Sequence, residues 1–270
     1  ILEIWGTKSD SMDIIGYVAS IFIGISLGLI GGGGSILTVP VLVYLFGISA
    51  ELSTAYSLFI VGTTALVGGI RNATLGNVNY KTAVVFTIPA FIAVYVTRAF
   101  VVPKIPAEIL TVGDFVLTKD VAIMIFFALV MLAASVSMIR DKRGEVEESD
   151  DEVEPQFNIP AIIAEGAVVG VLTGIVGAGG GFLIIPALVL FAKIPMKKAV
   201  GTSLLIIAAK SLIGFIGDVQ RPDLEIDWTL LLTVTAIAVV GIFIGIYLAK
   251  FIDGKKLKKG FGWFVLLMAI

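Results

Sequence analysis

The chain has 270 residues, of which 58% are hydrophobic and 15% are charged, and its net charge is −2. A soluble domain has about 45–50% apolar and about 25% charged residues, so the composition indicates a membrane protein, and the small net charge gives no sign of nucleic-acid binding. Cysteine and histidine are absent, which excludes disulfides, thiol chemistry, most metal sites and histidine-based catalysis, and we expect no cofactor.

Eight apolar segments follow one another along the chain, and several are about 17–25 residues long, enough to cross the roughly 30 Å hydrocarbon core as a helix. The segments span residues 12–46, 50–69, 80–102, 119–139, 160–192, 196–216, 228–249 and 258–270. The first lacks a basic leader and a small-residue cleavage site, so we expect no cleaved signal peptide. The last is short for a full span and is interpreted as a truncated helix. We expect an all-α polytopic protein of the cell (inner) membrane.

One long polar stretch divides the chain. It runs from Arg140 to Asn158 and is rich in Asp and Glu, a composition typical of an exposed linker. We therefore expect a first half at 12–139, an acidic linker at 140–158 and a second half at 159–270.

The two halves share a sequence motif. The matched stretches are GLIGGGGSILTVP (28–40) with GIVGAGGGFLIIP (174–186) and, after a two-residue insertion, NVNY (77–80) with EIDW (225–228). The offset of 146 residues holds without a gap from Gly24/Gly170 to Gly68/Gly214. Composition alone makes Gly- and Leu-rich sequences alike, but one register survives 45 positions. We therefore predict two copies of one structural repeat.

Charged residues between the segments predict how the halves lie in the bilayer. The basic residues form clusters at Arg71 and Lys81, at Arg140, Lys142 and Arg143, at Lys193, Lys197 and Lys198, and at Lys250, Lys255, Lys256, Lys258 and Lys259. The loop 217–227 is acidic. If segment 160–192 crossed the membrane once, one basic cluster would lie outside. A hairpin that enters and leaves on the same side keeps every basic cluster cytoplasmic, as the positive-inside rule favours.

A re-entrant hairpin at 160–192 implies, by the repeat, a second one at 12–46 that enters from the outside. Each half then has one Gly-tipped hairpin and three transmembrane helices. Because three is odd, the second half is inverted relative to the first, as in many secondary transporters. The alternative is an eight-span bundle with kinked first helices and parallel repeats, and it puts lysine clusters on the wrong side.

The glycine runs at the two hairpin tips form the first candidate site. Unpaired backbone at membrane depth is tolerated only where protein buries it or where it lines a wet cavity. Each tip precedes a stretch that can begin a helix, whose N-terminus carries about +0.5 charge and free N–H groups that attract anions. The candidate ligands are Gly32, Gly33, Gly34, Ser35, Gly179, Gly180 and Gly181. No Gly-Lys-Ser/Thr follows, so this is no P-loop; alternatively, the glycines only permit tight helix packing.

The helices after each hairpin add polar candidates. The hydroxyls that can donate to an oxyanion are those of Tyr56, Ser57, Thr202 and Ser203. Lys210 lies seven residues after Ser203, on the same helix face. A lysine at the bilayer centre costs about 2.5–3.5 kcal/mol and is a functional candidate. Alternatively, Lys210 extends to the outer interface or pairs with Asp218.

Carboxylates are nearly absent from the apolar segments. Glu165 lies about one turn inside the second hairpin, where an interfacial glutamate is the simpler interpretation. We interpret the acidic run 145–154 as a solvated linker rather than a divalent-cation site. Nothing resembles a catalytic dyad or triad, so we assign no catalytic or metal-binding residue and do not expect an enzyme.

The paired pattern G-x-x-x-G-x-x-G-x-G-G-x(5)-P-x-L resembles the TauE/SafE family of sulfite-exporter-like membrane proteins. AVGTSLLII at 199–207 and GNVNYKTA at 76–83 are also similar to that family's repeats. The resemblance implies a bacterial-type inner-membrane transporter that exports sulfite or organosulfonates such as sulfoacetate, and fold transfers better than cargo. This chain departs from the pattern at Tyr56, which replaces the threonine matched by Thr202, and Lys210 is not a recognised family feature.

The residues and the resemblance together predict a transporter that works by alternating access. A small sulfur oxyanion would bind between the glycine tips, assisted by Ser57, Thr202, Ser203 and Lys210. Two alternatives stay open: a passive anion channel of the same architecture, and a divalent-cation exporter that uses Glu165 and the acidic linker. The expected partners are the anion and the lipid bilayer, and a homodimer stays open.

Overall fold

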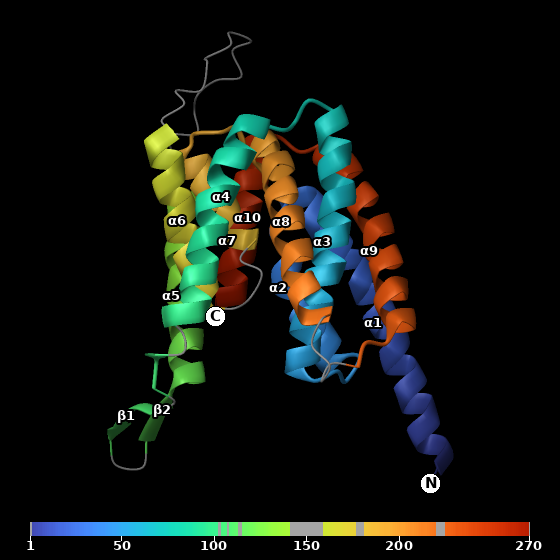
Figure 1. Cartoon of the computed structure of the whole chain (residues 1–270). Helices are drawn as coiled ribbons and strands as arrows, with labels where there is room; N and C mark the ends of the chain where they lie inside the picture. The colour runs from blue at the N-terminus through green and yellow to red at the C-terminus, as the bar shows by residue number, and fades with distance from the viewer. Residues whose placement is uncertain are drawn as a thin grey trace.

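The computed structural model describes the chain except for residues 1, 102–103, 107, 113–114, 141–158, 177–180, 220–224 and 270. The described part is mostly helical (Figure 1). Its elements are α1 (Leu2–Ile30), α2 (Gly34–Tyr44), α3 (Ala50–Thr74), α4 (Tyr80–Val96), the π-helical turn η1 (Thr97–Val101), β1 (Glu108–Val112), β2 (Phe115–Thr118), α5 (Lys119–Arg140), α6 (Ile159–Val176), α7 (Gly181–Pro186), the π-helical turn η4 (Ala187–Phe191), α8 (Met196–Val219), α9 (Trp228–Ala249) and α10 (Gly254–Ala269). The predicted linker 140–158 lies outside the described residues from position 141 onward.

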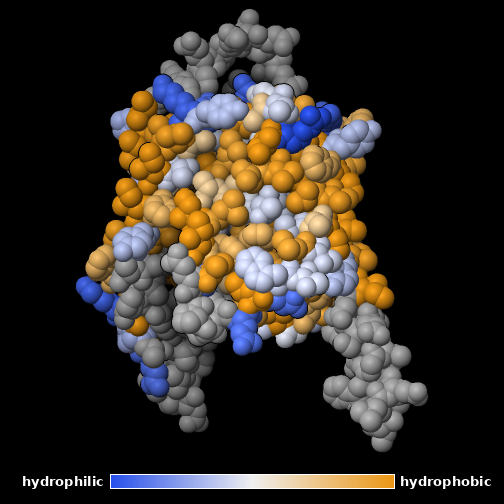
Figure 2. Space-filling model, turned by 45° about the vertical axis from the view of Figure 1, so that its right-hand side comes forward, coloured by the Kyte–Doolittle hydropathy of each residue, from blue (hydrophilic) through white to orange (hydrophobic). Residues whose placement is uncertain are grey.

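Within the described residues, three helices are long and apolar enough to cross a membrane. They are Leu52–Thr74, Met196–Ile216 and Trp228–Ala249, and shorter apolar helices accompany them. Hydrophobic side chains cover much of the middle of the face seen in Figure 2, and hydrophilic ones gather along its upper edge. A hydrophobic surface of this kind suits a bundle surrounded by lipid tails, because polar side chains are costly there.

The helices α1 and α2 form an antiparallel hairpin. At the turn, Gly34 packs against Leu27, and at the far end the ring of Phe46 lies 5.2 Å from that of Tyr17, centroid to centroid. Gly31 ends α1 with a φ of +75°, a conformation that glycine adopts without steric strain. The end of α2 therefore returns to the part of the bundle from which α1 rises (Figure 1).

The corresponding segment of the second half also reverses, although its predicted tip at 177–180 lies outside the described residues. The helix α6 runs beside α4 in the same direction, with Gly166 against Phe86 and Gly170 against Ala90. The chain then comes back through α7 and η4 to the start of α8. In Figure 1, α6 and α8 both begin at the upper end, opposite the end from which α1 rises.

Glycines bring helices of the two halves into close contact. On α1, Gly24 lies against the Ala238 carbonyl of α9, and on α6, Gly170 lies against the Ala90 carbonyl of α4. These two contacts correspond in the repeat, since Gly24 matches Gly170, and Ala90 matches Ala238 after the two-residue insertion. Around them, buried apolar side chains of α1, α3, α8 and α9 form the core, among them Ile23, Ala65, Leu204 and Ile242.

One element departs from the all-α expectation. The strands β1 and β2 pair as an antiparallel hairpin between α4 and α5, with Val112 opposite Phe115. The sequence of both strands is rich in β-branched and aromatic residues, which favour extended backbone. We overlooked this hairpin because the apolar segments on either side of it carried the stronger signal.

The contact between α1 and α9 leads to a stability prediction. In Gly24→Ala the new methyl group meets the Ala238 backbone, and overpacking of this kind costs about 1–3 kcal/mol. We expect a lower thermal midpoint for the purified protein in detergent. The control is Gly260→Ala in α10, where a methyl group would meet no atom within 4 Å and alanine favours the helix by about 1 kcal/mol. Equal midpoints for the two variants would contradict the close contact.

Candidate functional site

The turn at residues 31–33, called the first tip here, lies against the second half of the chain. A methyl group added to Gly31 would lie 2.6 Å from the Ser203 Oγ of α8 and 3.0 Å from the Ile185 side chain of α7. A methyl group added to Gly181, at the start of α7, would lie 3.1 Å from the Ser35 Oγ of α2. Ser35 and Gly181 are matched positions in the repeat, so the two halves meet at equivalent points.

The first tip leaves backbone donors at the start of α2. The N–H groups of Gly31 and Gly32 are occupied, since they donate to Leu27 O at 2.7 Å and to Ile30 O at 2.9 Å. Gly33 is the N-cap and provides no side-chain cap. The first N–H groups of a helix have no partner within it, and in α2 these belong to Gly34 and Ser35. The start of α2 thus has the dipole and the donors that bind anions in other proteins.

Ser26 is a candidate site residue that the sequence analysis did not name. Its hydroxyl is buried and makes no hydrogen bond within the described part of the chain. A methyl group added to Gly33 would lie 2.6 Å from Ser26 Oγ, so this hydroxyl lies directly beside the uncapped start of α2. A buried polar group without a partner costs about 1–3 kcal/mol, and such groups call for an explanation. The one sequence signal was a serine two residues before Gly28 in an apolar helix.

The other predicted residues fall into two groups. Ser35 and Ser203 lie at the junction of the halves, where their hydroxyls donate to Gly32 O at 2.7 Å and to Val200 O at 2.8 Å. Ser57 is buried in α3 and Lys210 is half-buried midway along α8. Neither appears among the contacts at the first tip that the described residues make. Gly179 and Gly180 lie outside the described residues.

Thr202 and Tyr56 connect the halves by matched hydrogen bonds. The Asn79 N–H donates to Thr202 Oγ1 at 3.0 Å, and the Asp227 N–H donates to the Tyr56 hydroxyl at 2.6 Å. Asn79 and Asp227 are the N-caps of α4 and α9, and each cap carboxamide or carboxylate accepts from its own helix. Tyr56 and Thr202 occupy matched positions, so the departure from the family pattern at Tyr56 preserves the bond with a longer side chain.

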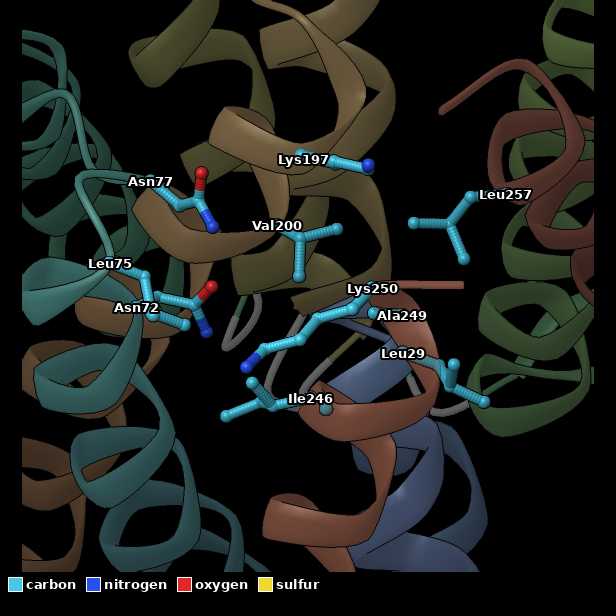
Figure 3. A pocket seen from close by; sticks show the side chains of 11 residues that line it. Leu29, Asn72, Leu75, Asn77, Lys197, Val200, Ile246, Ala249, Lys250 and Leu257 are labelled. Carbon is cyan, nitrogen blue, oxygen red and sulfur yellow. The ribbon is translucent and has the colours of Figure 1, made fainter. Parts of the chain in front are cut away.

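A cavity of about 320 Å³ opens beside the first tip. We call it the basic cavity, and its lining residues are Gly28, Leu29, Asn72, Leu75, Asn77, Lys197, Val200, Ile246, Ala249, Lys250 and Leu257. Figure 3 shows the Lys250 side chain directed toward Asn72, with Lys197 and Val200 contributed by another wall. The lining carries two ammonium groups and no carboxylate. The sequence analysis placed Lys197 and Lys250 in separate clusters and could not bring them together.

A cation site finds less support among the described residues. They contain no cluster of three or more acidic side chains that could hold a metal ion. Glu165 is partly buried in α6, and its Oε2 makes no hydrogen bond within the described part of the chain.

The apolar helical bundle with its cavity is that of a multi-pass membrane protein. Residues 17–270 match the family described as Sulfite exporter TauE/SafE, and the chain belongs to this family, which confirms the resemblance carried by the paired motif.

Relatives in bacteria and archaea carry transporter names. A "Probable membrane transporter protein" of Xylella fastidiosa is 28% identical over 92% of this chain and 90% of its own length. A protein of that description from Bacillus subtilis, YunE, is 27% identical over 73% of this chain and 76% of its own length. MJ0441 of Methanocaldococcus jannaschii is 36% identical over 42% of this chain and 43% of its own length. No solved structure matches the chain significantly. Family and relatives indicate a membrane transporter rather than an enzyme.

The bond between Asn79 and Thr202 can be tested directly. Thr202→Val keeps the shape of the side chain but removes the oxygen that accepts from the Asn79 N–H. We expect a loss of about 1–3 kcal/mol of stability and faster hydrogen exchange at the start of α4. Thr202→Ser keeps the oxygen and should retain slow exchange. If Thr202→Val left exchange at Asn79 unchanged, this connection between the halves would be wrong.

Proposed function

We propose that the protein is a secondary transporter that exports a small sulfur oxyanion, such as sulfite or an organosulfonate like sulfoacetate, by alternating access. The observation that carries the proposal is the buried Ser26 hydroxyl, which has no partner among the described residues and lies beside the uncapped start of α2. An oxyanion would accept hydrogen bonds from this hydroxyl and from the first N–H groups of α2 while its charge faces the positive end of the helix dipole. The family's description as a sulfite exporter supports the choice of cargo.

The proposed architecture is an inverted repeat with a re-entrant hairpin in each half. Three matched features support it: the contact between Ser35 and Gly181, the paired glycine contacts of α1 with α9 and of α6 with α4, and the two N-cap hydrogen bonds between the halves. Each feature joins one half to the other at equivalent positions. A two-fold relation of this kind is typical of carriers that rock one half against the other around a central site.

The proposed orientation puts the linker and the start of α8 in the cytoplasm of a cell with an inner membrane. Lys197 and Lys198 at the start of α8 and Lys250 and Lys255 after α9 would then all be cytoplasmic, as the positive-inside rule favours. A monoanion that leaves a negative-inside cell gains about 2.3 kcal/mol per 100 mV. Export therefore needs no coupled ion.

In the proposed site the donors at the first tip are uncharged. The hydrogens of the Ser26 hydroxyl, the Gly34 N–H and the Ser35 N–H carry partial positive charge, and Ser203 Oγ lies at the same junction. Neutral donors cost far less to bury than an ammonium group, so they can stay buried without a counter-ion when no anion is bound. Their moderate strength also lets the anion leave, which a carrier requires.

A transport assay tests the proposal. Wild-type protein in liposomes should move radiolabelled sulfite under an imposed potential. In Ser26→Ala we expect KM to rise about tenfold or more, because a hydrogen bond to a charged group contributes about 1.5–3 kcal/mol. Stability should not fall, since the hydroxyl has no partner among the described residues.

The matched control is Ser20→Ala in the same helix, where the buried hydroxyl donates to Gly16 O at 2.8 Å. That variant should lose some stability and keep the wild-type KM. Failure of the wild-type protein to move sulfite or a sulfonate would contradict the proposed cargo. Equal KM values for both serine variants would contradict the proposed site.

Counterflow separates a carrier from an anion channel with the same site. A carrier returns faster when it is loaded, so unlabelled sulfite on the far side should accelerate entry of labelled sulfite. We expect this stimulation and saturation with substrate concentration. Linear flux without stimulation would favour the channel.

A further inference from the structure

We infer that the basic cavity is a loading site that binds a small oxyanion or sulfonate from the lysine-rich face, before the anion reaches the first tip. The lysine-rich face is the end of the bundle that holds the start of α8 and the end of α9, with Lys197, Lys198, Lys250 and Lys255. The inference rests on the proposed function for the identity of the anion and the direction of its movement. It assigns a role to Asn72, which was not among the site residues predicted from the sequence.

The chemistry of the cavity suits a small anion. Lys197 at the start of α8 and Lys250 directly after α9 provide two ammonium groups, and Asn72 and Asn77 add carboxamides from α3 and the loop that follows it. Lys197 is half-buried, and Asn72 is buried with its side-chain amide held by Gly68 O at 3.0 Å. Two ammonium groups in a concave site without a carboxylate in its lining raise the local concentration of anions.

The position of the cavity connects it to the first tip. Gly28 and Leu29 line the cavity and belong to the last turn of α1, directly before Gly31. Val200 also lines the cavity, and its Cα would lie 3.2 Å from a methyl group added to Gly31. One residue of α8, Val200, therefore lies next to both the cavity and the first tip.

The repeat matches basic and amide residues of the cavity lining with acidic residues of the other half. The matched positions are Lys197 with Glu51, Asn72 with Asp218 and Asn77 with Glu225. If both halves carried the same residues at these matched positions, an anion would be attracted equally from either side of the membrane. Here the cavity carries two lysines, whereas Asp218 and Glu225 of the other half repel anions, so loading is favoured from the lysine-rich face. The size of this difference should fall as salt screens the charges.

Kinetics in membrane vesicles of defined orientation test the inference. The variant is Lys197→Gln/Lys250→Gln, and the control is Lys198→Gln/Lys255→Gln, which removes the same charge from exposed lysines outside the cavity. In inside-out vesicles with a clamped potential, sulfite meets the lysine-rich face. We expect the cavity variant to raise KM for sulfite about tenfold with unchanged maximal rate, and the control to keep KM within about twofold.

In right-side-out vesicles the cavity variant should keep the wild-type KM, because sulfite then enters from the face opposite to the basic cavity. Equal KM values for the two double variants in inside-out vesicles would overturn the loading site and leave the proposed function intact. If the wild-type protein moved no sulfur oxyanion, the proposed function would fail instead. The cavity would then be judged by thermal stabilisation with sulfite, and loss of that stabilisation in the cavity variant alone would support it, whereas equal stabilisation in both variants would overturn it.

Discussion

Buried backbone N–H and C=O groups need hydrogen-bond partners, and the structure around the buried Gly31 follows from this constraint. The positive φ of Gly31 ends α1, so the turn must satisfy its own backbone. Gly31 and Gly32 donate to carbonyls of α1, and the Ser35 hydroxyl donates to Gly32 O. What remains is a small set of donors at the start of α2, with the Ser26 hydroxyl beside it. The candidate site is the part of the turn whose donors find no partner among the described residues.

Close packing at glycines brings the helices of the two halves together. Because Gly24 and Gly170 carry no side chain, α1 approaches α9 and α6 approaches α4 backbone to backbone. Lipid tails are as apolar as leucine, so such helices associate through close contact rather than through the hydrophobic effect. The N-cap bonds to Thr202 and Tyr56 add directional connections between the halves. Both kinds of contact join the repeats to each other, which leaves the two halves interdependent.

Along the proposed transport path, charged groups attract the anion first and hydrogen-bond donors bind it afterwards. Ammonium groups act over a long range but are expensive to bury, so they suit a mouth that faces water. Backbone donors and hydroxyls act only in contact but cost little at depth. The basic cavity and the first tip have these two characters in that order, and Val200 lies next to both. An anion that moves from the basic cavity to the first tip exchanges long-range attraction to ammonium groups for direct hydrogen bonds.

Much of the fold could be predicted from the sequence, because a helix in lipid needs a long apolar run and the motif of 28–40 recurs at 174–186. The helices α3, α8 and α9 lie where the apolar segments predicted them, and the glycine run at Gly31 does break its segment. The strands β1 and β2 were missed because their alternation is weak beside long apolar neighbours. Three further features could not be predicted from the sequence. They are the position of Ser26, the hydrogen bond between Asn79 and Thr202, and the presence of both Lys197 and Lys250 in the lining of one cavity. They depend on which helix faces which, and that is decided by packing between helices far apart in the chain, whereas hydropathy and repeats report only on neighbours and on matched positions.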